Sequence, residues 1–193
     1  RLHNVEAGYR LQQTGSTLLG EGTSLRLEAN YFFMNYRNQL VATGQLNDVG
    51  SVLRTNIPSS YRTGMELTAA AGWADKLSLS STLTLSRNQL RNFREVVYIY
   101  NDDYDLVGQR ELEYRNSTIS FSPAVVSAST VEAQPLKGLC TALLLKTVSR
   151  QFLDNSASSE RSIPAYQVLD LRLRYTLRPA WLQEIELGLL VNN

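Results

Sequence analysis

Few side chains in this chain of 193 residues could perform catalysis or bind a metal. His3, near the first residue of the sequence, is the only histidine, and Cys140 is the only cysteine, so we expect neither a Ser-His-Asp triad nor a zinc site. Asp102, Asp103 and Asp105 lie close together, but the glycine and the distal glutamate of an EF-hand loop are not at the required spacing. The sequence therefore predicts a protein that is not an enzyme and holds no cofactor or metal ion.

Binding chemistry is concentrated between residues 93 and 114, where tyrosine and arginine are interspersed. These side chains offer a large contact area, stacking, and charge-assisted hydrogen bonds to anionic or catecholate-like chelates. The alternative is an aromatic girdle with solvated loop charges. The candidate ligand-binding residues are Arg94, Tyr98, Tyr100, Tyr104, Arg110 and Tyr114.

The stretch from Leu77 to Ser86 indicates which elements carry these residues. Its odd-numbered positions are leucine except at Ser81, and its even-numbered positions are serine or threonine. Side chains of an extended strand point alternately to opposite faces. The stretch therefore predicts a strand with one apolar and one hydroxyl-covered face. In a soluble protein the apolar face would be the core, whereas in an outer-membrane barrel it would face lipid.

The same alternation recurs along the chain and predicts eight long strands joined by links of two alternating classes. Soluble strands usually have about five or six residues, whereas a tilted membrane strand needs roughly nine to eleven. Long loops on one rim and short turns on the other are typical of outer-membrane barrels. The predicted strands are 5–13, 24–41, 60–73, 77–92, 115–135, 139–152, 164–177 and 184–193. The short links are 74–76, 136–138, 178–183 and, by position, 14–23, and the long links are 42–59, 93–114 and 153–163.

Charged residues on the polar parity of these strands have both signs, which suits water or a bound plug domain better than an ion-selective pore. Taken one by one, each is more simply a solvated or cross-strand-paired charge of the wall. The predicted lumen-facing residues are Arg26, Glu28, Arg62, Glu66, Glu132, Lys146, Asp170, Arg172, Arg174 and Glu186.

Composition excludes several other classes of protein. The formal net charge is +1 and 43% of the residues are hydrophobic, which gives no reason to expect nucleic-acid binding. No run approaches the roughly 18 apolar residues of a membrane helix. The final residues, 189–193, still read as a strand, and an open sheet of eight such strands would leave two unpaired edges, which lipid does not tolerate. We therefore expect a fragment of a larger barrel.

Four segments carry a resemblance to a known family. Tyr31 to Val41 with Thr43 to Gly50, Asn56 to Leu67, Gln151 to Asn155 and the closing Val191 to Asn193 are similar, in this order, to TonB-dependent outer-membrane receptors. The resemblance implies a barrel of about 22 strands in the outer membrane of a Gram-negative bacterium, closed by an N-terminal plug domain. Residues 1–193 would then form part of the barrel domain, with the plug and the last strand absent.

The resemblance further implies the partners and the function. Outer loops and the plug would capture a scarce nutrient, most simply a ferric siderophore, and the TonB complex would act through the plug to energise uptake. Haem is less expected, because haem receptors of this family usually carry histidine on barrel loops and residues 4–193 have none. The alternatives are a passive porin and a soluble β-sandwich binding module.

Overall fold

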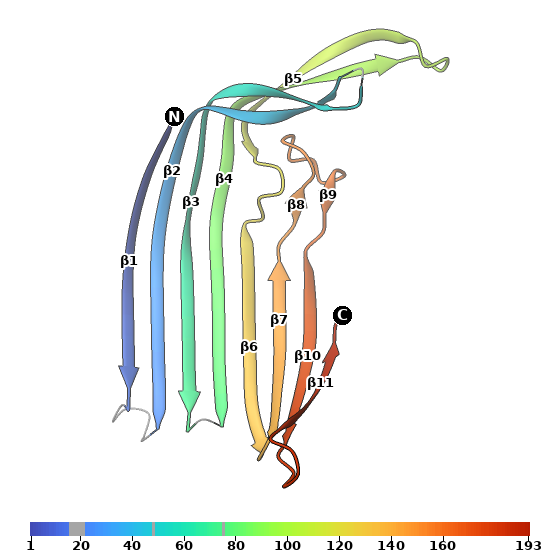
Figure 1. The fold of residues 1–193 in the computed structure, drawn as a ribbon. Helices are drawn as coiled ribbons and strands as arrows, with labels where there is room; N and C mark the ends of the chain where they lie inside the picture. Colours follow the sequence, from blue (N-terminus) through green and yellow to red (C-terminus); the bar gives the residue numbers. More distant parts are fainter. Residues whose placement is uncertain (16–21, 48, 75) are drawn as a thin grey trace.

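The computed structural model describes residues 1–15, 22–47, 49–74 and 76–193, and every regular element within these ranges is a β-strand (Figure 1). No helix among the described residues is long and apolar enough to cross a membrane. The strands are β1 (Leu2–Thr14), β2 (Thr23–Leu46), β3 (Val52–Trp73), β4 (Leu77–Tyr100), β5 (Leu106–Thr118), β6 (Val125–Leu136), β7 (Leu139–Val148), β8 (Gln151–Phe152), β9 (Ser162–Ile163), β10 (Tyr166–Leu177) and β11 (Ile185–Val191).

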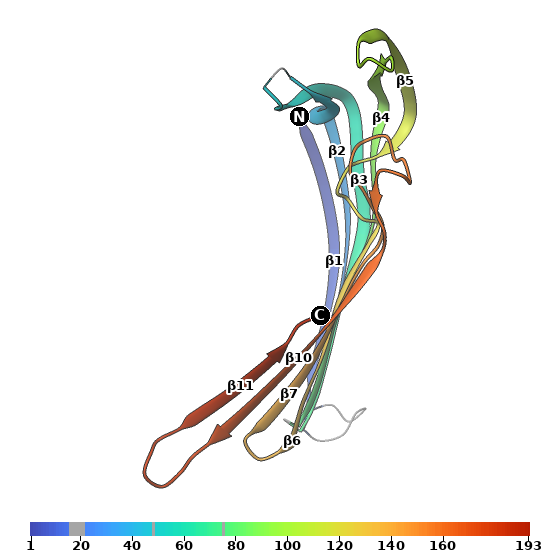
Figure 2. The same cartoon turned by 90° about the vertical axis from the view of Figure 1, so that its right-hand side faces the viewer.

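Eight of these strands form one antiparallel wall in the order β1-β2-β3-β4-β6-β7-β10-β11. β5 lies off this path and pairs with the far part of β4, while β8 and β9 form a separate small hairpin. Apart from these insertions, each strand lies next to its neighbour in the sequence, as in an up-and-down barrel. The predicted all-β antiparallel architecture of about eight wall strands is confirmed, and the wall is an open, curved sheet (Figure 2).

The register of the strand pairs places the alternate positions that were predicted to be apolar on the same side of the wall in every strand. Leu79 pairs with Ala71 on β3 and with Val131 on β6. Val131 in turn pairs with Leu143 on β7, which pairs with Leu171 on β10. Cross-strand partners in a sheet share a face, so one apolar surface runs across the wall and a polar surface lies on its other side.

Two hairpins, formed by the far parts of β2 and β3 and by the far part of β4 with β5, extend beyond one end of the wall and are called the tall hairpins below. The predicted strand ends were wrong at this end of the wall. Most of the predicted long links 42–59 and 93–114 is strand, because β2 and β3 continue to Leu46 and from Val52, and β4 and β5 continue almost to their turn at Tyr104. The predicted strand 115–135 is interrupted between β5 and β6, and 139–152 divides into β7 and β8. The link 153–163 contains β9.

Two asparagines in a left-handed backbone conformation explain why the alternation is lost there. Asn38 has φ 55° and Asn92 has φ 56°, a region that asparagine enters more readily than most residues. Exposure in β4 shows the result, because Leu90 and Phe93, three positions apart, are both buried. The buried positions move from even to odd residue numbers at Asn92, although the pairing of β4 with β5 keeps a constant offset from Gln89 to Ile99. Beyond these two positions the hairpins turn away from the axis of the wall (Figure 1).

A small hydrophobic core lies where the hairpins leave the wall. It consists of Val41, Ile57, Leu90, Phe93 and Ile119, each at most 7% exposed. Tyr114 packs against it, with its ring centroid 6.0 Å from that of Phe93. Because the wall strands bury few side chains of their own, this core is the part of the described structure that fixes the hairpins by packing.

At the opposite end the links are short, as predicted for 74–76 and 136–138: β4 begins at Leu77 after β3 ends at Trp73, with residue 75 outside the described residues, and β7 begins at Leu139 after β6 ends at Leu136. The second of these depends on Gly138, which has φ 84° and whose carbonyl accepts a hydrogen bond from the amide of Thr176 at 2.8 Å. A Cβ atom at Gly138 would lie 2.5 Å from the carbonyl oxygen of Thr176. Glycine is therefore required at this turn both by its conformation and by the close approach of β10. Residues 16–21 of the predicted link 14–23 lie outside the described residues.

Candidate functional site

The six predicted ligand-binding residues lie on one β-hairpin, built by the far part of β4 and by β5 (Figure 1). The prediction that they belong to a loop was wrong for five of them, which are in strands, and only Tyr104 lies in the turn. Tyr104 has φ 63° and is 88% exposed, and its amide donates a hydrogen bond to the carbonyl of Asn101. A paired hairpin holds its side chains in a defined pattern, which an irregular loop would not do.

The hairpin divides the predicted residues between its two faces. Arg94 and Tyr98 share one face, where Arg94 forms a 2.9 Å ion pair with Glu113. Arg110 pairs with Val97 and lies with Tyr114 on the other face, which is the face of the buried Phe93. Within its described structure, the hairpin therefore does not bring all six side chains to one surface.

A polar network joins the hairpin to the segment between β8 and β9. Glu95 is only 5% exposed, and both of its carboxylate oxygens accept hydrogen bonds from Arg161, at 2.8 and 3.3 Å. Tyr114 donates its hydroxyl to Glu95 at 2.8 Å, and Arg161 also pairs with Asp154 at 2.9 Å. A buried carboxylate needs such partners, so the network fixes the position of the hairpin relative to residues 153–161.

The network also shifts the protonation equilibria of its members. Burial, followed by the hydrogen bond to Glu95 and its charge, raises the pKa of the Tyr114 hydroxyl above its ordinary value. The hydrogen bond to Glu95 is the main reason that the pKa of Arg161 is also raised, and the charges of Asp154 and Glu95 add to it against the effect of burial. Both shifts favour the state in which Tyr114 is neutral and Arg161 is charged.

Asn155 is a second connection, and it forms hydrogen bonds with β2 and with the end of β5 and the residues just after it. Its side chain donates a hydrogen bond to the carbonyl of Ala42 on β2 at 2.8 Å and accepts one from the amide of Ser120 at 2.9 Å. The hydroxyl of Ser117, at the end of β5, donates to the carbonyl of Asn155. Asn155 is 2% exposed, so it ties both tall hairpins to the segment that follows β8.

The sequence indicated no role for Glu95, Asn155 or Arg161. One signal was present, because the resemblance to the receptor family included Gln151 to Asn155, but that motif carried no assignment of contacts. The partners of Asn155 lie up to 113 positions away. Alternation within a strand contains no information about such distant pairs.

All ten residues predicted to face the lumen lie on the polar side of the wall, as the register of their strands shows. Several are paired across strands. Glu28 forms ion pairs with Arg10 and Arg26, and Lys146 approaches Asp170 at 4.0 Å. These pairs agree with the simpler interpretation of wall charges that stabilise one another, and whether this face lines a lumen stays a prediction.

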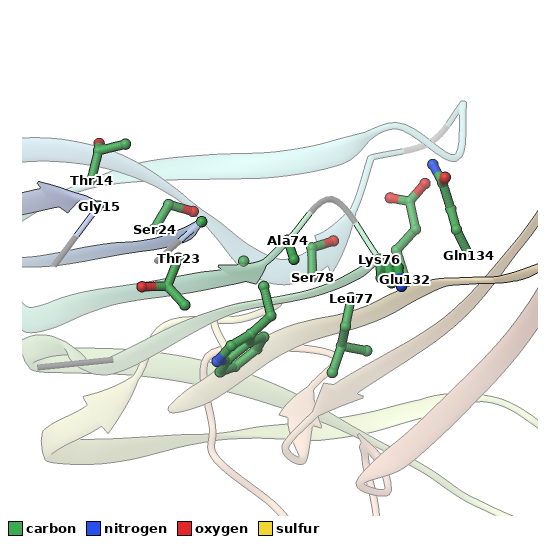
Figure 3. Close-up of a pocket in the computed structure, with 13 residues that line it drawn as sticks. Thr14, Gly15, Thr23, Ser24, Ala74, Lys76, Leu77, Ser78, Glu132 and Gln134 are labelled. Carbon is green, nitrogen blue, oxygen red and sulfur yellow. The ribbon is translucent and has the colours of Figure 1, made fainter. Parts of the chain in front are cut away.

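A hollow of about 600 Å³ with a mixed polar and apolar lining opens at the end with the short turns (Figure 3). The hydroxyls of Ser24 and Ser78, the charged Lys76 and Glu132, and the amide of Gln134 are among the groups that line it. The backbone amide of Gln134 donates to the backbone carbonyl of Lys76 at 2.8 Å, which joins β6 to the link between β3 and β4. The described residues hold no group of three or more His, Cys, Asp or Glu arranged for a metal ion.

The comparisons with known proteins agree with this architecture. Among the solved structures that match is a mutant of the ferric enterobactin receptor from Pseudomonas aeruginosa, with a TM-score of 0.59 and 19% sequence identity over 100% of this chain. The chain spans only 25% of the length of that receptor chain, so the likeness is one of fold and covers part of a larger barrel. No curated protein matches this sequence.

The family comparison covers the whole chain. The model described as "TonB dependent receptor-like, beta-barrel" matches residues 1–193. Proteins of this family are transporters rather than enzymes, in agreement with the scarcity of catalytic side chains. The two-faced wall, its short turns and tall hairpins, and this match together show that the chain belongs to the β-barrel family of TonB-dependent receptors.

Proposed function

We propose that residues 1–193 form part of the barrel wall of an outer-membrane receptor in a Gram-negative bacterium, and that the receptor takes up a ferric siderophore. The observation that carries the proposal is a wall with one continuous apolar face and one charged face. Leu77, Leu79 and Leu85 are each 41% exposed, and the described residues supply no second layer that covers them. Such a face is suited to hydrocarbon tails and not to a soluble β-sandwich.

The dimensions of the wall support the same placement. On the apolar face, Trp73 of β3 pairs with Thr23 of β2 and with Leu77 of β4, and this row begins an apolar band. The band ends near Phe33 and Arg87, which lie ten positions beyond Thr23 and Leu77 on their strands. A tilted membrane strand needs roughly nine to eleven residues to cross the hydrocarbon. β2 and β4 have 24 residues each, so their remaining parts project beyond the membrane. In outer-membrane barrels the longer connections are outside the cell.

Charges of both signs on the other face favour a receptor over a passive porin. Arg26, Glu28, Lys146 and Asp170 lie on this surface and form ion pairs. A selective pore usually presents one sign of charge. A mixed surface suits contact with an N-terminal plug domain of the same protein, through which the TonB complex would drive uptake.

The tall hairpin supplies the outer contact with the ligand. Arg110, Tyr100 and Tyr104 are exposed, whereas Arg94 and Tyr114 are engaged by Glu113 and Glu95. Free arginine and tyrosine side chains suit an anionic, aromatic chelate. The structural neighbour is by name a ferric enterobactin receptor, which supports a siderophore as the class of cargo without identifying it.

The proposal is tested with the full-length receptor in an iron-limited bacterium that lacks its own siderophore receptors. We expect growth on at least one ferric siderophore, and we expect growth to disappear when TonB is deleted. Uptake of small solutes that does not depend on TonB would instead identify a passive channel. Absence of growth on every ferric siderophore, with the receptor correctly inserted, would remove iron as the cargo.

The ligand surface is tested by two matched substitutions on opposite faces of the hairpin. Arg110→Ala removes an exposed cation from the face of the hairpin that also carries Phe93. We expect siderophore affinity to fall about tenfold or more, as for loss of a charge-assisted hydrogen bond. Tyr98→Ala alters the other face and should change affinity less. Equal affinity for both variants and the wild type, measured by equilibrium binding, would exclude the hairpin from the ligand surface.

A further inference from the structure

The apolar face of the wall carries a cluster of arginines at one end. Along this face of β2 from 23 to 37, of β3 from 59 to 73 and of β4 from 77 to 91, the charged side chains are Arg37, Arg87 and Arg91, and no aspartate or glutamate shares the face with them. All three are exposed and none forms an ion pair within the described residues. Three exposed cations without an ion-pair partner in the described wall, at the edge of an apolar surface, are available to a partner from outside the wall.

The arginines lie next to a group of aromatic side chains on the same face. Arg37 and Arg91 both pair with Ser59, from opposite sides of β3, so the two are separated by one strand. The guanidinium of Arg91 lies 5.4 Å from the ring centroid of Tyr61. Phe33 stacks on the other side of this arrangement, with ring centroids 6.5 Å from Tyr61. The cation–π contact holds Arg91 at a fixed position on the face.

The depth of this cluster identifies the chemistry of its partner. Aromatic girdles mark the boundary between hydrocarbon and headgroups, and Tyr31, Phe33 and Tyr61 lie about ten residues along the strands from Trp73 at the other boundary. Arg87, Arg91 and Arg37 therefore lie at the level of the headgroups on the side of the tall hairpins. Guanidinium groups bind phosphate oxygens through paired hydrogen bonds, and cations near this boundary extend toward the headgroups.

We propose that Arg37, Arg87 and Arg91 form a binding site for the phosphate of an anionic lipid in the outer leaflet, with Tyr61 positioning Arg91. The proposal depends on insertion of the wall into a membrane and is independent of the nutrient that is transported. Charge complementarity selects a phosphorylated lipid over a zwitterionic one, because the site contains no acidic side chain to pair with a cationic headgroup. Each basic residue near an anionic surface contributes a modest and similar share of the attraction.

The test measures lipid binding to the purified full-length receptor by native mass spectrometry. The probe is phosphatidic acid, with phosphatidylcholine as the zwitterionic comparison. We expect the wild type to retain phosphatidic acid preferentially, and we expect the double variant Arg87→Gln/Arg91→Gln to bind it about 30-fold more weakly. Arg178→Gln, which changes an exposed arginine at the end with the short turns, is the matched control and should leave the affinity unchanged.

Three results would overturn the proposal. The first is an unchanged affinity of the double variant for phosphatidic acid, and the second is equal retention of phosphatidylcholine by the wild type. The third is binding of inorganic phosphate alone with the same affinity and the same dependence on the two arginines, which would indicate a site for a free anion. If the double variant does not fold, Arg37→Gln and Arg91→Gln are measured singly. Siderophore uptake by the folded variants should be normal, so a failure of this proposal is distinct from a failure of the proposed function.

Discussion

Asn155 contributes to the hairpin end of the wall through a set of hydrogen bonds that another side chain could not reproduce easily. An amide both donates to Ala42 and accepts from Ser120, whereas a carboxylate only accepts. The side chain is almost fully buried. Removing it would leave two partly buried backbone groups, the carbonyl of Ala42 and the amide of Ser120, without this partner, which costs more than the bonds themselves contribute.

We therefore expect Asn155→Ala to loosen both tall hairpins while the wall remains folded. The expected loss is about 1 kcal/mol for each of the two groups, the low end of the range for an unsatisfied buried group, because both are only partly buried. Hydrogen exchange on the full-length receptor should show faster exchange in residues 149–163 and in the hairpins. Asn116→Ala, at an exposed position of β5, serves as the control. Unchanged exchange in Asn155→Ala would mean that the hairpins are held by the hydrophobic core alone.

Tyr114 gives the same region a dependence on alkaline pH. Its pKa is raised in the folded state because the ring is partly buried and the hydroxyl is bonded to Glu95. A group with a raised pKa stabilises the folded state fully below its ordinary value of about 10, and this contribution is lost as the pH rises through the higher folded value. Deprotonation would place a phenolate beside the Glu95 carboxylate.

We expect the thermal stability of the wild type to fall more steeply above about pH 10 than that of Tyr114→Phe, which cannot ionise at this position. Below that pH the variant should be slightly less stable, because it lacks the hydrogen bond to Glu95. Melting temperatures measured across this range would check both statements. Parallel pH profiles for the two proteins would show that Tyr114 does not titrate in the folded state.

At the scale of the strands, Gly64 allows an aromatic ring to lie across the polar face of β3. The register places Gly64 between Phe32 and Ser86. A Cβ atom at this position would lie 2.7 Å from Cζ of Phe32 and would also meet the backbone carbonyl of Leu85. The backbone oxygen cannot move away without disturbing the pairing of β3 with β4.

Gly64→Ala should therefore destabilise the barrel by about 1–3 kcal/mol through overpacking. Gly188→Ala is the matched control, because a Cβ atom there meets nothing within 4 Å. Denaturant unfolding of the full-length receptor in lipid vesicles would compare the two. If both variants unfold at the same denaturant concentration as the wild type, Phe32 does not depend on the space above Gly64.

At the scale of the whole molecule, an added charge should destabilise the wall on its apolar face and have little effect on its polar face. Leu83 pairs with Leu67 and Ser127 on the apolar face, midway between the rows of Trp73 and Arg87, and Thr82 is its neighbour on the polar face. An arginine on the lipid face near the bilayer midplane costs about 2–4 kcal/mol.

We expect Leu83→Arg to lower the free energy of unfolding by about this amount and Thr82→Arg to change it little. Unfolding in vesicles of defined thickness is the appropriate measurement, since the penalty arises from hydrocarbon. A larger effect at Thr82 than at Leu83 would mean that the faces have been assigned the wrong way round, and the proposed lipid site would fail with that assignment.

The sequence by itself determined the two-faced strands, their approximate number and the side on which each charged residue of the wall lies. These features follow from an alternation of two residues, which the geometry of an extended chain imposes locally. Leu79 and Asp170 could be assigned to opposite faces without any knowledge of their partners, because every strand obeys the same rule.

Only the tertiary structure decided how the hairpin end is built. Left-handed conformations at Asn38 and Asn92 change the parity of the buried positions, so alternation no longer reports which side chains face the core. The contacts of Asn155 with Ala42 and of Arg161 with Glu95 join residues 113 and 66 positions apart. Such contacts depend on how strands are placed relative to one another in space, and a local periodicity does not encode that arrangement.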